Sequence, residues 1–309
     1  MVYDWEGEDH KLSNYVNAKY VNKPEGMIRG RVDNSKYYYY GKKGERFEKR
    51  IRPNIRSYQV DELGALGFSP SGAKELRNIF KNNLEIKDFE TLLDVCEDLP
   101  VGVGKGSINF STKQGLIRGL VHLMSEDIFV LDSKEEFSIV PLLEQGLNLF
   151  FNFSGNVGLA RVEIMRQMNQ VIEWRKEKPS LTAPAIVFEE ADALFPKTPR
   201  AEEKPLVLKG INYLLRGRKL SLAQYYCCPS FANLNPKIGS GSNEMILGQM
   251  EGKDLNALND LKKDEFLLAK VRRLKYNRHK GEREFIYINE LGNQFVFKPF
   301  ECPQRYHEE

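Results

Sequence analysis

Hydrophobic positions in the centre of the chain follow two periods in alternation. Short apolar runs that predict buried β-strands occur at residues 147–153, 185–188 and 220–226. Between these runs, apolar residues recur at helical spacing at residues 159–176 and 205–216. Strands that alternate with helices predict right-handed crossovers and a parallel sheet. Because the runs are apolar throughout rather than at every second position, we expect both faces of that sheet to be covered.

The first part of the chain predicts a β-hairpin followed by helices. Residues 37–40 and 47–51 are β-prone and flank a glycine-bounded turn, and residues 56–60 predict a further strand. Helical spacing begins after Ser71, which suits an N-cap. It predicts helices at residues 71–84, 89–97 and 113–124.

The C-terminal part is predicted to return to β structure. Residues 265–271, 284–288 and 294–297 predict an antiparallel edge or hairpin. The whole pattern therefore predicts an α/β fold. It consists of a mostly parallel sheet with flanking helices, an inserted helical segment and a basic β-hairpin. We divide the chain into three parts. Residues 1–68 hold a first strand and the tyrosine-rich hairpin, residues 69–146 a helical insertion, and residues 147–309 a core that includes the C-terminal hairpin.

Composition fits a soluble globular protein. Hydrophobic residues make up 41% and charged residues 29% of 309 positions, which is enough for a full core. The 4 cysteines form no CxxC pair and no ligand set with histidine, which argues against a disulfide scaffold or structural zinc. We find no signal peptide and no apolar run long enough for a membrane span, and we expect a cytoplasmic protein.

The net charge of +3 hides an uneven distribution of charge. Residues 29–56 contain 10 basic and 3 acidic residues, and residues 262–283 contain 9 basic and 3 acidic residues. The first block includes the hairpin, whose cations are candidates for gripping a DNA backbone: Lys42, Lys43, Arg46, Lys49 and Arg50. The alternative is a surface hairpin whose tyrosines alternate between core and solvent.

Two carboxylates follow the apolar run at residues 185–188. Glu189 and Glu190 are therefore expected at the carboxyl end of a buried strand, where open α/β sheets bind ligands. In nucleotide hydrolysis the first acid would hold Mg²⁺ through water, and the second would orient the attacking water. The alternative is a strand that ends in two solvated glutamates.

Three cations surround a glycine just before the run at residues 220–226. Arg216, Arg218 and Lys219 suit phosphate recognition, because a guanidinium group meets phosphate oxygens in a bidentate way. The alternative is a solvated helix C-terminus, where the helix dipole favours cations.

No phosphate-binding loop of the GxxxxGK[ST] pattern occurs in the chain. The segment at residues 102–107 contains a Gly-Lys pair, but Leu99 stands where the pattern requires glycine and Gly106 where it requires serine or threonine. We interpret this segment as a linker.

Taken in order, these features resemble the HerA/FtsK superfamily of ring-forming DNA-pumping ATPases, closest to its HerA-type and conjugation-type branches. The resemblance is carried by a strand with an Asp-x-x-Gly-Glu element, the next strand, a Walker B-like segment, a Gly-Arg-Lys and Pro-Ser series, and a closing strand. These occupy residues 2–8, 149–154, 186–192, 217–230 and 293–299.

The resemblance implies a RecA-like core, Mg²⁺-ATP as fuel, a hexameric ring and double-stranded DNA as partner. It implies that Glu189 is the acid on the Mg²⁺ side and Glu190 the catalytic glutamate. It also implies that Arg216 or Arg218 reaches the phosphates of a neighbouring subunit's nucleotide, with Lys219 beside them.

The chain departs from the family pattern in two ways. After the sensor strand it has Tyr226, Cys227 and Cys228 where the family has a polar group. The resemblance also begins after the P-loop, so we expect the Walker A strand and loop to be absent from this chain. Truncation of a longer ATPase, a separate P-loop-bearing chain and evolutionary decay all remain open.

The expected function is therefore part or subunit of an ATP-driven DNA translocase for packaging, conjugation or end processing. It is an ATPase only if a Walker A segment completes it. The alternative is a non-hydrolysing, ATPase-like subunit that binds DNA or builds a ring.

Overall fold

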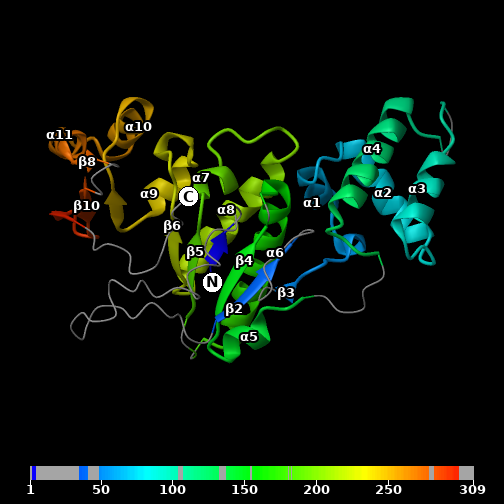
Figure 1. Cartoon of the computed structure of the whole chain (residues 1–309), viewed down its shortest axis with the longest axis horizontal. Helices are drawn as coiled ribbons and strands as arrows, with labels where there is room; N and C mark the ends of the chain where they lie inside the picture. Colours follow the sequence, from blue (N-terminus) through cyan, green and yellow to red (C-terminus); the bar gives the residue numbers. More distant parts are fainter. Residues whose placement is uncertain are drawn as a thin grey trace. The chain divides into compact units, whose positions relative to one another are not determined.

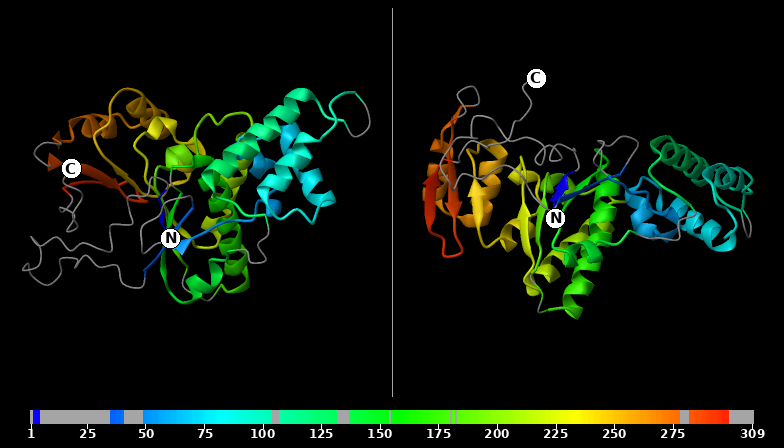
Figure 2. Two further views of the ribbon diagram at one scale, coloured as in Figure 1. Left: turned by 45° about the vertical axis from the view of Figure 1, so that its right-hand side comes forward. Right: turned by 60° about the horizontal axis from the view of Figure 1, so that its bottom comes forward.

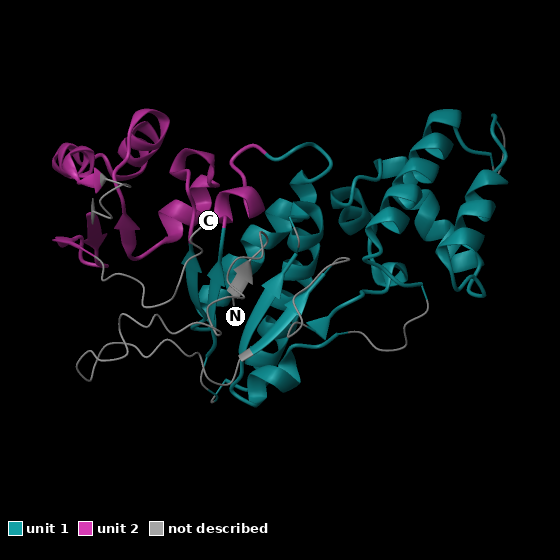
Figure 3. Ribbon diagram, in the orientation of Figure 1, with its two compact units in different colours: residues 1–10, 33–189, 199–226 teal, residues 11–32, 190–198, 227–309 magenta. Residues whose placement is uncertain are grey.

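The computed structural model describes most of the chain (Figure 1). The described residues are 2–4, 35–40, 49–103, 107–131, 137–153, 155–179, 181, 183–277 and 282–298. They fall into two compact units (Figure 3). Unit 1 holds the described residues up to Glu189 and the segment Pro199–Tyr226, and unit 2 holds Glu190–Thr198 and the described residues from Cys227 onward.

Unit 1 is built on a 6-stranded sheet with the order β3-β2-β4-β1-β5-β6. In that order the strands are Lys49–Arg50, Ser35–Tyr39, Asn148–Asn152, Val2–Asp4, Ala185–Phe188 and Ala223–Tyr226. Every pair of neighbouring strands is parallel. The predicted α/β fold with a parallel sheet is therefore confirmed.

The two faces of this sheet are covered unequally. On one face Phe151, Ile186 and Phe188 are fully buried. The helices α6 (Val157–Glu177) and α8 (Lys204–Lys219) pack together beside the sheet (Figure 2). On the other face Phe150 is buried, whereas Tyr225 on β6 is 57% exposed. The prediction that both faces are covered is therefore wrong at β6.

The predicted basic β-hairpin is also wrong, because β2 and β3 pair in parallel. Three tyrosine rings from β2 and the residue after it stack on phenylalanine rings from β4 and the residue after it. The ring centroids are 4.7 Å apart for Tyr37–Phe150, 5.5 Å for Tyr38–Phe151 and 4.8 Å for Tyr40–Phe153. These contacts make β2 a member of the central sheet rather than one arm of a local hairpin. The predicted turn at residues 41–44 lies outside the described residues.

Three helices of the inserted segment form where helical spacing predicted them, and a fourth, which was not predicted, precedes them. In chain order the four are α1 (Val60–Ala65), α2 (Pro70–Asn82), α3 (Phe89–Glu97) and α4 (Phe110–Glu126). Side chains of Ser69, Asp88 and Asn109 cap the last three at their N-termini. The strand predicted at residues 56–60 is wrong, because the Asn54 side chain accepts a hydrogen bond from Arg56 N and starts a 3₁₀ turn there. A short helix, α5 (Val140–Glu144), precedes β4.

A buried polar network ties this insertion to the sheet core. The carboxylate of Glu163 on α6 accepts hydrogen bonds from the Tyr40 hydroxyl at 3.1 Å and from the Tyr58 hydroxyl. The guanidinium of Arg166 lies 4.7 Å from the Tyr58 ring centroid and donates to Ser57 Oγ at 2.8 Å. Burial raises the pKa of Glu163, while these hydrogen bonds and Arg166 oppose the rise. The network gives the buried Glu163 carboxylate its hydrogen-bond partners. It also connects α6 to the residue after β2 and to residues 57–58, which lie just before α1 at the root of the insertion.

Unit 2 contains short helices and a small antiparallel sheet with the order β11-β10-β7. These strands are Gln294–Phe297, Phe285–Ile288 and Met245–Leu247, and a separate pair is formed by β8 (Tyr276–Asn277) and β9 (Glu282–Arg283). The helical elements are α7 (Ala191–Leu194), η4 (Phe231–Asn233), α9 (Pro236–Gly241), α10 (Gly252–Lys262) and α11 (Glu265–Arg273). The predicted C-terminal hairpin is confirmed by the pairing of β10 with β11.

The strand predicted at residues 265–271 is wrong, because this segment forms α11. The Asp264 side chain accepts from Leu267 N at 3.0 Å and caps the helix. Leu267 and Val271 are buried one helical turn apart, so the helical face supplies the core that a strand would have supplied. Across the described part of the chain, no helix combines the length and the apolar character needed to cross a membrane.

Two glycines of α4 test the packing of the insertion. A Cβ atom at Gly119 would lie 2.6 Å from Phe68 Cε1, and Phe68 is buried, whereas no atom lies within 4 Å of a Cβ at Gly115. We expect Gly119→Ala to lower the free energy of unfolding by about 1–3 kcal/mol. Gly115→Ala should raise it by roughly 0.5–1 kcal/mol through helix propensity. Urea denaturation measures both, and equal effects would contradict this packing.

Candidate functional site

The two predicted carboxylates lie at the carboxyl edge of the parallel sheet. Strand β5 pairs with β1 on one side and with β6 on the other, and Glu189 and Glu190 follow directly after its last residue. Asp4 and Asn152, paired in register, end β1 and β4 at the same edge. This edge is where parallel sheets place ligand-binding residues.

The backbone turns sharply at Glu190. Its φ of 48° and ψ of 43° lie in the left-handed region, which costs a residue with a Cβ atom about 1–2 kcal/mol. The next residue, Ala191, begins α7, and its N–H donates to Cys227 O at 2.8 Å. The segment after β5 is thereby held against the segment after β6. Strained backbone of this kind concentrates at functional sites.

A polar cluster in unit 2 follows the turn. Asp192 on α7 is 9% exposed, and burial raises its pKa, with the Asp254 charge adding to the rise and a hydrogen bond to Asn233 opposing it. Asp254 Oδ1 accepts from Ser230 Oγ at 3.0 Å and from Ala232 N at 2.7 Å. Sequence reasoning missed Asp254, although it singled out the segments that contain Asp192 and Ser230. Only the fold brings the three together.

The cysteines that replace the expected polar sensor differ in exposure. Cys227 is exposed, and Cys228 is half-buried. Burial raises the pKa of the Cys228 thiol to about 12, and the charge of Asp192 adds to the rise. At neutral pH this thiol is therefore uncharged and only a weak hydrogen-bond donor.

The predicted phosphate-binding cations lie at the opposite edge of the sheet. Arg216, Arg218 and Lys219 occupy the last turn of α8, which leads into the amino end of β6. Because β5 and β6 are parallel and in register over four residues, the amino and carboxyl ends of these strands are about 10 Å apart along the strand direction. The structure does not bring these cations together with Glu189.

The predicted DNA-binding cations are divided by the structure. Lys42, Lys43 and Arg46 lie outside the described residues. Lys49 on β3 is exposed, whereas Arg50 Nη2 lies 3.0 Å from Asp127 Oδ2 at the end of α4. Arg50 therefore stabilises the contact between β3 and the insertion.

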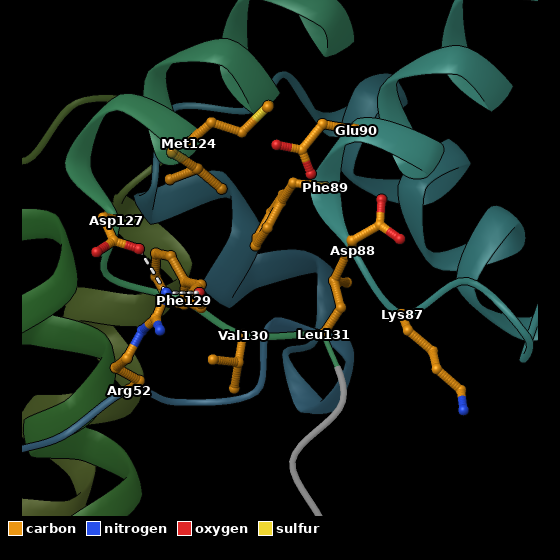
Figure 4. A pocket seen from close by; sticks show the side chains of 11 residues that line it. Arg52, Lys87, Asp88, Phe89, Glu90, Met124, Asp127, Phe129, Val130 and Leu131 are labelled. Carbon is orange, nitrogen blue, oxygen red and sulfur yellow. Dashed lines mark hydrogen bonds and ion pairs between the residues drawn. The ribbon is translucent and has the colours of Figure 1, made fainter.

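A cavity of about 410 Å³ opens in the helical insertion (Figure 4). Apolar side chains of Leu123, Met124 and Phe129 line it, and the Arg52–Asp127 ion pair lies at its rim. None of the sequence-predicted site residues lines this cavity.

The donor set fits a magnesium ion that is held mainly by water and phosphate. Within the described ranges, no three His, Cys, Asp or Glu side chains converge as a protein-only metal cage. Mg²⁺ in nucleotide-binding sites typically uses one or two carboxylates together with water and phosphate oxygens. Glu189, at the end of β5, can supply one such carboxylate.

Comparisons with known proteins give structural neighbours only. No family model and no curated protein matches the chain. The chain is similar to the genome packaging NTPase B204 of Sulfolobus turreted icosahedral virus 2 in complex with ATP-gammaS, at 14% identity and a TM-score of 0.37, over 54% of this chain and 76% of that one. It is also similar to the bacterial conjugative coupling protein TrwB lacking its N-terminal part, at 13% identity and a TM-score of 0.49, over 96% of this chain and 70% of that one.

A complex of TrwB with a non-hydrolysable ATP analogue gives a TM-score of 0.36 at 13% identity, over 96% of this chain and 76% of that one. The neighbours are thus of the packaging and conjugation kinds that the sequence resemblance names. All three TM-scores are below 0.5. The function proposed below therefore rests on the residues of this chain.

The raised pKa of Asp192 gives the stability of the chain a dependence on pH. The folded chain keeps the Asp192 proton above its ordinary pKa of 3.8, whereas the unfolded chain releases it there. This stabilising contribution is complete below pH 3.8 and is lost as pH rises through the folded pKa. Chemical denaturation at several pH values should show that Asp192→Asn flattens this fall. Asp260→Asn, at an exposed position on α10, should leave it unchanged.

The conformation of Glu190 predicts a second effect on stability. Glycine adopts the left-handed region without a Cβ penalty, so Glu190→Gly should raise the free energy of unfolding by about 0.5–1 kcal/mol. Lys263, with a φ of 51° at the end of α10, offers a matched control in Lys263→Gly. A loss of stability at Glu190 with a gain at Lys263 would mean that contacts of the Glu190 carboxylate outweigh its strain.

Proposed function

We propose that this chain is part or subunit of a ring-forming, ATP-driven translocase of double-stranded DNA, of the HerA/FtsK kind. ATP hydrolysis requires a P-loop supplied by further sequence or by another chain. The observation that carries this proposal is the pair Glu189 and Glu190 at the carboxyl edge of a parallel sheet, with Glu190 in a strained conformation. A solvated strand end does not require that conformation.

The two glutamates have separate roles in this proposal. Mg²⁺-ATP supplies the phosphoryl group and the charge that activates it. Glu189, which follows β5 directly, would hold Mg²⁺ through water. Glu190, turned away from the strand axis by its backbone, accepts a hydrogen bond from the attacking water and takes up its proton.

The exposed face of the sheet at β6 and the position of β6 at the edge of the sheet support the proposal that a P-loop segment completes the sheet. Within the described residues β6 pairs only with β5, and Tyr225 on its less covered face is 57% exposed. A strand added beside β6 would pair the remaining backbone groups of that edge, and its helix would cover Tyr225. The same addition would bring phosphate-binding groups close to the carboxyl end of β5.

The position of the cations supports action between subunits. Arg216 and Arg218 lie in the last turn of α8, at the amino edge of the sheet, whereas the two glutamates follow its carboxyl edge. In a ring they would reach the nucleotide of a neighbouring subunit, with Lys219 beside them. A guanidinium group there neutralises charge that develops on the transferred phosphoryl group.

The decisive test is ATP hydrolysis by the chain joined to, or mixed with, a segment that carries GxxxxGK[ST]. We expect DNA-stimulated hydrolysis that Glu190→Gln lowers at least 100-fold, because the water loses its general base. Glu251→Gln, at an exposed position before α10, is the matched control and should retain full activity. Equal hydrolysis by the Glu190→Gln variant and the parent would remove Glu190 from the mechanism.

The alternative function is a non-hydrolysing subunit that binds DNA or builds a ring. It is favoured by the replacement of the sensor group with Tyr226, Cys227 and Cys228, since the uncharged Cys228 thiol is a weak partner for phosphate. Nucleotide binding distinguishes the two functions. A chain supplied with its P-loop segment that binds DNA in a salt-sensitive way but binds no ATP analogue is the non-hydrolysing subunit.

A further inference from the structure

The small sheet of unit 2 has one face that is buried at β7 and β10 but open at β11, where Val296 is 56% exposed, and one face that is open on all three strands. Ile286 and Ile288 on β10 and their partners Leu247 and Met245 on β7 are buried, together with apolar residues of α10 and α11. Alternate residues of the same strands must point to the other face. We call that side of the sheet the outer face.

The outer face is a surface of aromatic rings. Its members are Ile246, Phe285, Tyr287, Phe295 and Phe297, and none of them is buried. The rings stack across β10 and β11 in two pairs, with centroids 5.9 Å apart for Phe285–Phe297 and 6.4 Å apart for Tyr287–Phe295. Phe295 is 54% exposed and Ile246 is 63% exposed. A contiguous apolar surface of this kind marks a binding site.

Charge is distributed unevenly along this hairpin. At its open end, beside the Phe285–Phe297 pair, lie the exposed cations Lys275, Arg283 and Lys298. Arg283 already lies over an aromatic ring, 5.7 Å from the centroid of Tyr276, which is itself exposed. Lys298 Nζ is 4.0 Å from Glu284, which leaves it mostly solvated.

The other end of the hairpin is acidic. Glu290 lies in the turn between β10 and β11, and a hydrogen bond to Glu244 raises the pKa of the Tyr287 hydroxyl. The charge distribution therefore favours an anionic ligand at the end with Arg283 and Lys298. Planar groups of that ligand would lie on the aromatic rings beside these cations.

We propose that the outer face binds unpaired, single-stranded nucleic acid. Bases of a single strand expose π-faces that stack on aromatic side chains, and its phosphates suit the cations at the open end. A duplex does not fit this surface, because its bases are stacked on each other and hidden from the rings. The site uses neither Glu189 nor Glu190, so it does not depend on the proposed hydrolysis.

Binding of a fluorescent single-stranded oligothymidine to the full chain, followed by fluorescence anisotropy, tests the proposal. We expect Phe295→Ala to weaken binding roughly tenfold or more through lost stacking. Phe295→Leu keeps an apolar side chain and should weaken binding similarly, which separates stacking from folding. Phe266→Ala, at a 79% exposed ring on α11, is the matched control and should bind as the parent does.

The salt dependence of the same titration tests the cations. Replacing Arg283 and Lys298 with glutamine should reduce the slope of log affinity against log salt by about 1.4, since each phosphate contact in a single strand contributes about 0.7. The proposal is overturned if the parent binds no single strand, or if the Phe295 variants bind it unchanged. It is also overturned if those variants instead abolish self-association in light scattering, because the outer face would then contact a second copy of this chain.

Discussion

The position of β5 inside a parallel sheet is the constraint on which the candidate site depends. Ile186 and Phe188 are fully buried, so the strand cannot shift its register without exposing them. The chain must leave the sheet at Glu189, at the same edge where β1 and β4 end in Asp4 and Asn152. Burial of two apolar side chains thus determines where two carboxylates meet solvent.

Aromatic packing and a buried polar network hold the remainder of unit 1 to that strand. The tyrosines of β2 stack on the phenylalanines of β4, which makes a polar-looking segment part of the sheet. Glu163 joins Tyr40 after β2 to Tyr58 at the root of the insertion. A movement of the insertion would therefore break hydrogen bonds to a buried carboxylate, which couples the two parts energetically.

The two units carry different kinds of surface. In unit 1, Glu189 follows the last residue of β5, and Tyr225 on β6 is exposed, which suits completion by a further segment. Unit 2 places aromatic rings on an open sheet face and cations at one end of a hairpin. We propose nucleotide chemistry for the first surface and contact with nucleic acid for the second.

The sequence by itself determined the parallel sheet, the helical insertion and the acidic strand end, because these depend on local periodicity and on neighbours along the chain. It misjudged β2, β3 and α11. Stacking on Phe150 and Phe151 is a contact between residues more than one hundred positions apart. By contrast, the N-cap at Asp264 that decided between helix and strand at residues 265–271 is a local contact, which the sequence prediction overlooked. The tertiary structure alone decided that Arg216 and Arg218 lie away from Glu189, and that Asp192 meets Asp254. The physical reason is that strand order and direction, which no local pattern encodes, determine which ends of distant segments share an edge.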